Sequence, residues 1–363
     1  MGGDESTTER AVGAPGVASP LSVSVAGREL SGTTALAALG VGFLLFAPAI
    51  LADYLIQILT LSLIFALFAI SVDLLWGYTG ILTFGHAVFL GGGAYLMGTL
   101  LEAVGTGPAI VYAGLAAGTV LPGLLGLVVA GVLFSRGISE DYFTIITLAL
   151  AIIAEQIAVS WSSVTNGANG LLVPPARVGI PGVVATELTG VPFYYLCVGV
   201  LLAGYLVARR IVDSPFGRAL VAINENETKA TALGYDTEKY KTLVFGVSSG
   251  MAGFAGTLYV LSERFISPPL LGFVQSTDVL IWVLVGGRGT LVGGILGTIS
   301  LRFFENTISG ALAFSWILVL GIVLILIVLL FPEGLVGVVE VARERLRDRR
   351  DDEATDHSSD PDL

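Results

Sequence analysis

The sequence predicts an all-α polytopic integral membrane protein with about eight to ten transmembrane helices. Hydrophobic residues make up 54% of the chain and charged residues 13%, and the mean hydropathy is +0.86. A soluble domain is far less apolar and more highly charged. Apolar runs of about 17 to 25 residues, the length that crosses a bilayer core, recur along most of the 363 residues.

Three regions follow from the distribution of charge. Residues 1–30 are polar and lack periodicity, which predicts a disordered acidic tail. Residues 31–337 form the predicted membrane domain, and residues 338–363 form a charged tail. Within the membrane domain, uninterrupted spans are expected at 33–50, 54–76, 80–101, 108–134, 142–163, 193–209, 242–262 and 313–331.

The basic residues predict the sidedness of these spans. Arginines and lysines crowd residues 209–241, and five arginines follow the last span, so both segments are expected in the cytoplasm. The loop at 164–192 contains only Arg177 as a basic residue and is expected outside. Counting crossings backwards from residue 209 places the N-terminus in the cytoplasm together with the C-terminus. The predicted location is therefore the cell membrane, with several crossings.

The apolar stretch 276–304 is predicted to be a broken hairpin. Its centre contains Gly286, Gly287, Arg288 and Gly289, and glycines break helices through their backbone freedom. An arginine inside a continuous span costs about 3 kcal/mol or more. The flanking spans also require an even number of crossings here. Ten crossings result if the turn reaches the cytoplasm, and eight if it is re-entrant.

The stretch GYTGILTFGHAVFLGGGAYLMGTL, residues 77–100, is apolar yet contains seven glycines. Small residues let helices approach closely in lipid, so we expect a thin helix at the centre of the bundle, either tightly packed or able to slide. Asp73 and Glu155 are the main carboxylates within spans, and an intramembrane carboxylate marks a candidate site. They leave open an ion-coupled secondary transporter.

Enzymatic and metal chemistry are not expected. The two histidines and the single cysteine, Cys197, match no metal-ligand spacing. No G-x-S-x-G elbow occurs, and no lysine follows a glycine, so the chain has no P-loop for ATP.

The cytoplasmic segment 212–241 is predicted to couple the chain to another protein. Ser214 and Pro215 favour a helix start before Phe216, and Asn224 favours a second start. Gly234 is expected to end the second helix. Two short helices, about 216–223 and 225–233, would then present Ala230, Ala232 and Leu233 to a groove on a partner.

Four segments together resemble the permease subunits of branched-chain amino acid ABC importers, the LivM type. They are GYTGILTFGHAVFLGGGAY, NGANGL at 166–171, SPFGRALVAINENETKATALGYDTEKYK, and LVGGRGTLVGGILG at 284–297. The resemblance covers about residues 54–337. Relatives of this type include urea and short-chain amide permeases, and IWVLVGGRGTL at 281–291 leans towards the urea branch.

The resemblance implies a transport subunit, not an enzyme. ATP with Mg²⁺ would be bound by two cytoplasmic partner ATPases, so no cofactor is expected on this chain. A second related permease, an extracellular solute-binding protein and membrane lipid are the implied partners, with no nucleic acid. The implied solute pathway includes Gly85, His86, Phe89, Tyr95, Asn166 and Asn169. The implied ATPase contact includes Ser214, Pro215, Phe216, Gly217, Arg218, Glu227, Ala230, Leu233 and Gly234.

The charge balance predicts a high-salt cytoplasm. The formal net charge is −11, and the chain has only three lysines, Lys229, Lys239 and Lys241. Dissolved salt screens the repulsion between carboxylates. An acidic tail in an ordinary cytoplasm is the other interpretation.

Overall fold

The computed structural model describes residues 22–25, 28–179, 186–187, 189–309 and 321. The chain divides into two compact units, Met1–Ala47 and Pro48–Leu363. The predicted span at 313–331 and the charged tail at 338–363 lie outside the described residues.

The first unit holds β1 (Ser22–Val25), β2 (Arg28–Ser31) and most of α1 (Gly32–Ile50). The two strands pair antiparallel, with Ser22 opposite Ser31 and Val25 opposite Arg28. The structure thus has two short strands within and beside the segment for which the sequence predicts a disordered tail. Ser-Val-Ser-Val alternates with a period of two, which is the pattern of a strand.

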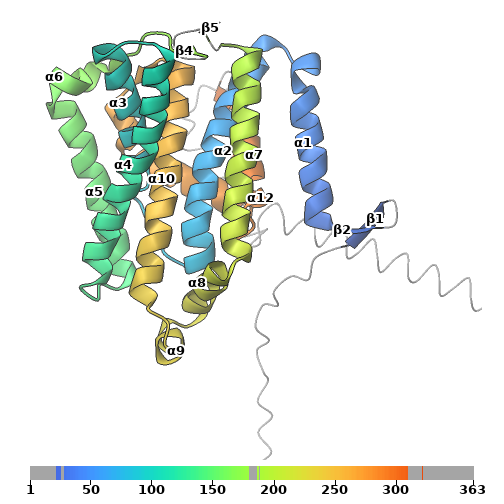
Figure 1. Ribbon diagram of the computed structural model, residues 1–363, viewed down its shortest axis with the longest axis vertical. Coiled ribbons are helices and arrows are strands. Elements are labelled where there is room, and N and C mark those ends of the chain that lie inside the picture. The colour runs from blue at the N-terminus through green and yellow to red at the C-terminus, as the bar shows by residue number, and fades with distance from the viewer. Residues whose placement is uncertain (1–21, 26–27, 180–185, 188, 310–320, 322–363) are drawn as a thin grey trace, which may run out of the picture. The chain divides into compact units, whose positions relative to one another are not determined.

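The second unit is a helical bundle, which confirms the predicted fold class (Figure 1). Five helices of its described part, α2, α4, α5, α7 and α10, are long and apolar enough to cross a membrane. Its helices are α2 (Asp53–Thr79), α3 (Ala87–Ala103), α4 (Pro108–Phe134), α5 (Glu140–Ser160), α6 (Ser162–Thr165), η1 (Gly167–Asn169), α7 (Val191–Asp213), α8 (Pro215–Glu225), α9 (Glu227–Ala232), α10 (Thr237–Glu263), η2 (Pro268–Leu271), α11 (Phe273–Gly286) and α12 (Val292–Ser309).

Short strands and short helices mark the two ends of this bundle (Figure 1). One end carries β4 (Arg177–Val178), which pairs with β5 (Thr186–Glu187), and we call it the β4–β5 end. At the opposite end α8 and α9 project from the long helices, and we call it the α8–α9 end. A further two-residue ladder joins β3 (Leu171–Leu172) to β6 (Phe265–Ile266).

Helices α2 and α10 form the interior of the bundle. Helix α2 is apolar on all sides and is buried along most of its length, as expected for a helix surrounded by others. Helix α10 packs against α2, α3 and α4. The buried part of α10 consists largely of Gly, Ala and Ser, which let neighbouring backbones approach. Helices α4, α5 and α7 expose apolar side chains, as a lipid-facing surface requires.

The glycines of the segment 77–100 do not form one continuous thin helix. Helix α2 ends at Gly80, whose φ of +80° is left-handed, and α3 begins only at Ala87. The expected span at 80–101 is therefore wrong in its first seven residues. Hydropathy alone does not distinguish a broken apolar segment from a helix.

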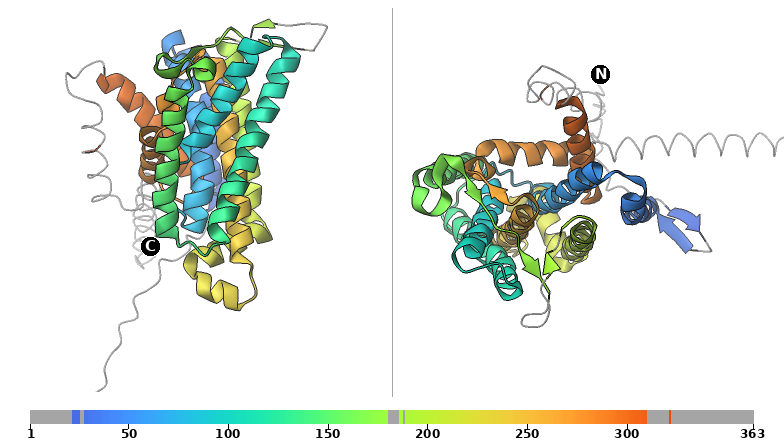
Figure 2. Two further views of the ribbon diagram at one scale, coloured as in Figure 1. Left: turned by 90° about the vertical axis from the view of Figure 1, so that its left-hand side faces the viewer. Right: turned by 90° about the horizontal axis from the view of Figure 1, so that it is seen from above.

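A second break separates α11 from α12. Helix α11 has 14 residues and is about 21 Å long at 1.5 Å per residue, which is too short to cross the bilayer core. Seen from above, α11 lies on its side, whereas most long helices are viewed close to end-on (Figure 2). Residues 287–291 connect it to α12, and the two helices pack against each other.

Adjacent glycines in α3 offer a test of this packing. A methyl group on Gly93 would overlap the backbone of Gly253 in α10, whereas one on Gly92 would meet nothing within 4 Å. We expect Gly93→Ala to lower the free energy of unfolding by about 1–3 kcal/mol through overpacking. Gly92→Ala should leave it unchanged or raise it by about 0.5–1 kcal/mol. Thermal unfolding of both variants in detergent measures this, and equal midpoints would contradict the close approach.

Candidate functional site

The broken connection between α2 and α3 lies inside the bundle. Side-chain oxygens replace helical hydrogen bonds along it: Thr79 Oγ1 accepts from Ile81 N at 3.4 Å, and Thr83 Oγ1 accepts from Gly85 N at 3.2 Å. Such local bonds compete with helix formation. From α5, the Thr144 hydroxyl donates to the Leu82 carbonyl at 2.9 Å. The connection is therefore unwound but largely hydrogen-bonded.

The start of α3 meets the start of α11. The Ala87 amide donates to Ser276 Oγ at 3.0 Å, and the rings of Phe84 and Phe273 lie 5.3 Å apart. The unwound connection and the start of α11, far apart in the sequence, thus form one central region. Transport proteins commonly place discontinuous helices at the site where solute passes.

His86 is fully buried in this region, with 0% exposure. Its Nε2 atom lies 3.2 Å from Ser71 Oγ and 3.1 Å from Ser248 Oγ. Both serine hydroxyls donate to backbone carbonyls, Ser71 to Phe68 and Ser248 to Ser71. Each hydroxyl therefore has lone pairs to accept from the histidine, which assigns the proton to Nε2 in the neutral tautomer.

Aromatic rings enclose the rest of this histidine. Phe68 stacks on it with ring centroids 5.8 Å apart, and Phe89 and Phe245 approach edge-on. The Nδ1 atom has no hydrogen-bond partner among the described residues. In this conformation His86 is a buried connection between α2, α3 and α10.

The predicted pathway residues fall into two groups. Gly85, His86 and Phe89 are buried together at the start of α3. Asn166 and Asn169 are exposed in the loop after α5, where the Asn166 amide closes its own turn by donating to the Gly170 carbonyl at 2.7 Å. Tyr95 lies in α3, and its buried hydroxyl has no partner among the described residues.

Asp73 holds the hairpin turn against α2. One carboxylate oxygen accepts from Gly289 N at 2.7 Å and the other from Leu291 N at 2.8 Å. The guanidinium of Arg288 donates to the Trp76 carbonyl, with Nη2 at 2.8 Å, and lies 4.8 Å from the Trp76 ring centre. Gly287 and Gly289 both have positive φ, at +115° and +79°. The turn therefore lies beside the last turns of α2, towards the α8–α9 end.

The start of α8 is capped by the predicted residue, whereas the start of α9 is capped by a different one. Ser214 Oγ accepts from Gly217 N, which starts α8. Asn226 Oδ1 accepts from Lys229 N at 2.9 Å, so Asn226 caps α9 in place of the predicted Asn224. Gly234, with φ +94°, follows the end of α9. Hydrogen bonds from Lys239 hold the pKa of the exposed Asp236 below its usual value.

The exposed side of α9 differs from the prediction. Ala230 is only 2% exposed, whereas Leu233 is 79% exposed. Ala230 therefore packs inside the chain, and its expected place on a partner-facing surface is wrong. In a helix of only six residues the sequence has too few positions to fix which side faces inwards.

A buried lysine connects α9 to the membrane helices. The Lys241 side chain, 4% exposed, places its ammonium group 2.7 Å from Glu227 of α9 and 2.9 Å from Glu140 at the start of α5. Helix α5 in turn holds the unwound connection through Thr144 and packs beside Gly85 at Thr147. A continuous chain of contacts therefore runs from α9 to the central region.

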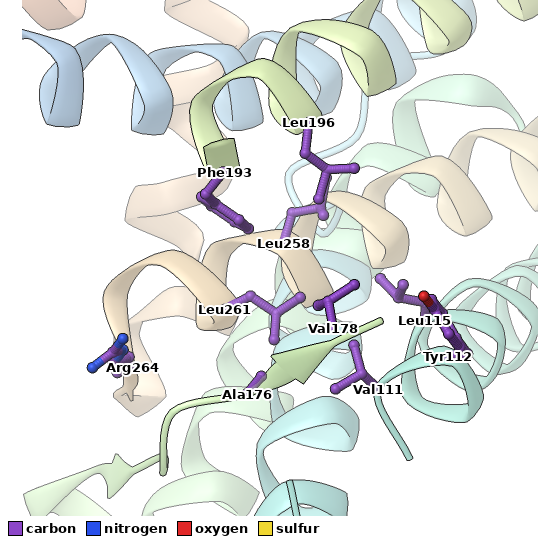
Figure 3. A pocket seen from close by; sticks show the side chains of 10 residues that line it. All are labelled: Val111, Tyr112, Leu115, Ala176, Val178, Phe193, Leu196, Leu258, Leu261 and Arg264. Atoms are coloured by element: carbon purple, nitrogen blue, oxygen red, sulfur yellow. The ribbon is translucent and has the colours of Figure 1, made fainter. Parts of the chain in front are cut away.

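An apolar pocket lies at the β4–β5 end (Figure 3). Its lining comes from α4, α7, α10 and the residues around β4, and Arg264 lies at the edge of the group. Tyr112 turns its hydroxyl to the Gly179 carbonyl at 3.1 Å. The remaining lining is apolar, namely Val111, Leu115, Ala176, Val178, Phe193, Leu196, Leu258 and Leu261. This pocket has few groups with which to orient a polar solute.

Long apolar helices around two broken segments are those of a multi-pass membrane protein, and broken helices of this kind are common in transport proteins. Residues 54–329 match the family described as the branched-chain amino acid transport system permease component. The chain belongs to this family, the permease subunits of branched-chain amino acid ABC importers. It is a transport permease subunit.

Individual relatives agree with this assignment. The permease protein LivM of Salmonella typhimurium, from a high-affinity branched-chain amino acid transport system, is 28% identical over 77% of this chain and 69% of its own length. A probable LivM of Methanocaldococcus jannaschii is 25% identical over 78% and 93%. The permease protein LivH of Escherichia coli is 25% identical over 78% and 94%. No solved structure gives a significant match.

The Asp73 contact can be tested by removing one acceptor. Asp73→Asn retains the size of the side chain but offers one oxygen to two amides, so one buried donor loses its partner. We expect a loss of about 1–3 kcal/mol in stability and faster amide exchange at Gly289 and Leu291, measured by hydrogen–deuterium exchange. Asp53→Asn, in the exposed first turn of α2, is the control. Unchanged exchange at the turn in Asp73→Asn would disprove the contact.

Proposed function

We propose that this chain is the membrane pathway subunit of an ATP-driven importer for branched-chain amino acids. Two cytoplasmic ATPases would hydrolyse ATP, an external binding protein would deliver the solute, and a second related permease would complete the pathway. The similarity to both LivM and LivH proteins, two permeases named in Escherichia coli, supports a paired arrangement. These relatives are named as branched-chain amino acid permeases, which supports an amino acid as the solute over urea or a short-chain amide.

The observation that carries this proposal is the connection from α9 to the central region. Leu233 is an exposed apolar side chain beside a short helix, which suits contact with another protein. Movement of α9 would pull on Glu227, and Lys241 would pass that movement to Glu140 and α5. ATP can shift the pathway between its states only if the partner contacts differ between them.

The sidedness of the bundle follows from its basic residues. The α8–α9 end carries Arg209, Arg210, Arg218 and the three lysines, so we assign it to the cytoplasm. The β4–β5 end then faces the outside and receives solute. The two terminal tails would be cytoplasmic, and their acidity fits a salt-rich cytoplasm.

An ion-coupled mechanism through Asp73 is less well supported. Both oxygens of this carboxylate already accept backbone amides of the hairpin turn. Binding a cation there would require the turn to detach. Glu155 remains partly exposed in α5, beside the Gly272 backbone.

Leu233→Arg tests the ATPase contact. The side chain is exposed, so the change should leave folding and membrane insertion intact while placing a charge against the partner. We expect the ATPase subunits to be lost on purification and leucine uptake to fall to background. Leu172→Arg is the matched control, since Leu172 is 77% exposed at the opposite end of the bundle. Retention of the ATPases by Leu233→Arg would refute the docking assignment.

Lys241→Met separates docking from coupling. Methionine fills a similar volume without the two ion pairs, and Glu140 and Glu227 remain partly solvated. We expect the ATPases to stay bound, while uptake per ATP hydrolysed falls by about ten-fold, on the scale of one lost charge-assisted contact. Lys239→Met, which removes an exposed lysine two residues away, should transport normally. Full coupling in Lys241→Met would show that the ion pairs transmit nothing.

A further inference from the structure

Four ionisable side chains gather where α2, α10, α11 and α12 meet. Arg302 binds Glu305 through Nη1 at 2.8 Å. Glu263 and Asp278 lie close enough for their charges to interact with that of Arg302. Glu263, Arg302 and Glu305 thus line one cleft, and Asp278 of α11 lies within electrostatic range of it. None of these residues belongs to the broken segments or to the α8–α9 contact described above.

This cluster is partly buried, with the side chains of Arg302 and Glu305 22% and 29% exposed. The Arg302 guanidinium lies 5.1 Å from the ring centre of Phe65, in the middle of the 27-residue helix α2. At 1.5 Å per residue, Phe65 is roughly 18 Å from the start of that helix. An ionised side chain within a membrane segment is costly, and such residues mark solute pathways and other functional sites.

A polar cleft leads from the cluster to the β4–β5 end. Its lining begins near the first turn of α2, where the Tyr54 hydroxyl donates to Asn306 Oδ1 at 2.7 Å. It continues past Gln57 to Glu263, Arg302 and Glu305. Ile58 and Leu61 complete the wall. The cleft therefore offers a polar route from the proposed delivery side to the Arg302 guanidinium.

The cluster has a guanidinium donor and a carboxylate that are both free to bind a ligand. Guanidinium has five N–H donors, and the Nε of Arg302 has no partner among the described residues. The Glu263 carboxylate accepts no side-chain hydrogen bond in the described part of the chain. A single guanidinium cannot neutralise both Glu263 and Glu305, so the cleft can accept an ammonium group as well as a carboxylate.

We propose that this cleft binds the zwitterionic head of an α-amino acid. Arg302 binds the carboxylate, Glu263 binds the ammonium group, and Ile58 and Leu61 contact an aliphatic side chain. The assignment rests on the proposed transport function and names its solute site. Urea, which carries no charge, would gain little from these residues.

Three compounds with one carbon skeleton test the site: L-leucine, 4-methylpentanoate without the ammonium group, and 3-methylbutylamine without the carboxylate. Binding to the full chain in lipid nanodiscs is measured by saturation-transfer NMR. We expect leucine to bind more tightly than either analogue. Arg302→Gln should weaken leucine binding by about ten-fold or more, as for a lost charge-assisted contact, yet retain 3-methylbutylamine. That retained binding shows that the variant is folded.

Further variants sharpen the result. Arg302→Lys should recover part of the affinity for leucine, and Glu263→Gln should abolish the preference for leucine over 4-methylpentanoate. Arg209→Gln and Glu102→Gln, which lie outside the cleft, should bind as the wild type does. Equal binding of all three compounds, or leucine binding unaffected by Arg302→Gln, would overturn the proposal. The Leu233→Arg experiment measures whether the ATPases stay bound and does not involve this cleft. It therefore tests the importer assignment separately from the solute site.

Discussion

Backbone polar groups inside a bilayer must find partners within the protein, and this requirement governs the centre of the structure. Two segments of the bundle leave the helical conformation, and each exposes amides or carbonyls that water cannot reach. Asp73 accepts hydrogen bonds from amides of the hairpin turn, and Ser276 accepts one from the first amide of α3. Thr144 donates a hydrogen bond to a carbonyl of the unwound connection. Several of the few polar side chains within the spans thus form hydrogen bonds with the backbone where the helices are interrupted. Chain breaks of this kind can persist only where such partners exist.

The same requirement explains what the sequence predicts well and what it does not. Helix α4, predicted at 108–134, has these bounds in the structure because a long apolar run flanked by Gly107 and polar residues is decided locally. The hairpin break was visible because an arginine among glycines cannot remain in a continuous span. The break at residues 80–86 was missed, since it contains no charge, and its signal was limited to Thr79, Gly80 and Thr83.

The functional residues show a similar division. The α8–α9 segment was found from its caps and its charge, but the burial of Ala230 depends on packing against other parts of the chain. The cluster around Arg302 is not predicted from the sequence, because its members come from three helices and each lies towards the end of an apolar run. A signal was nevertheless present: Asp278, Arg302 and Glu305 fall within about thirty residues of a membrane segment in which charge is costly. Which of them meet in space was not determined by their spacing.

The contact between Asp73 and the hairpin also bears on how the protein is made. Asp73 and Leu291 are separated by 218 positions in the chain, and ribosomes add about 5–20 residues per second. Roughly 10–40 s therefore pass between the synthesis of the carboxylate and that of its partner. During this interval α2, the most apolar helix of the bundle, carries an acid without its final ligands. The bundle can close around α2 only after α11 and α12 have left the ribosome. A chain that ends before residue 291 would therefore leave the Asp73 carboxylate without the Leu291 amide that it binds.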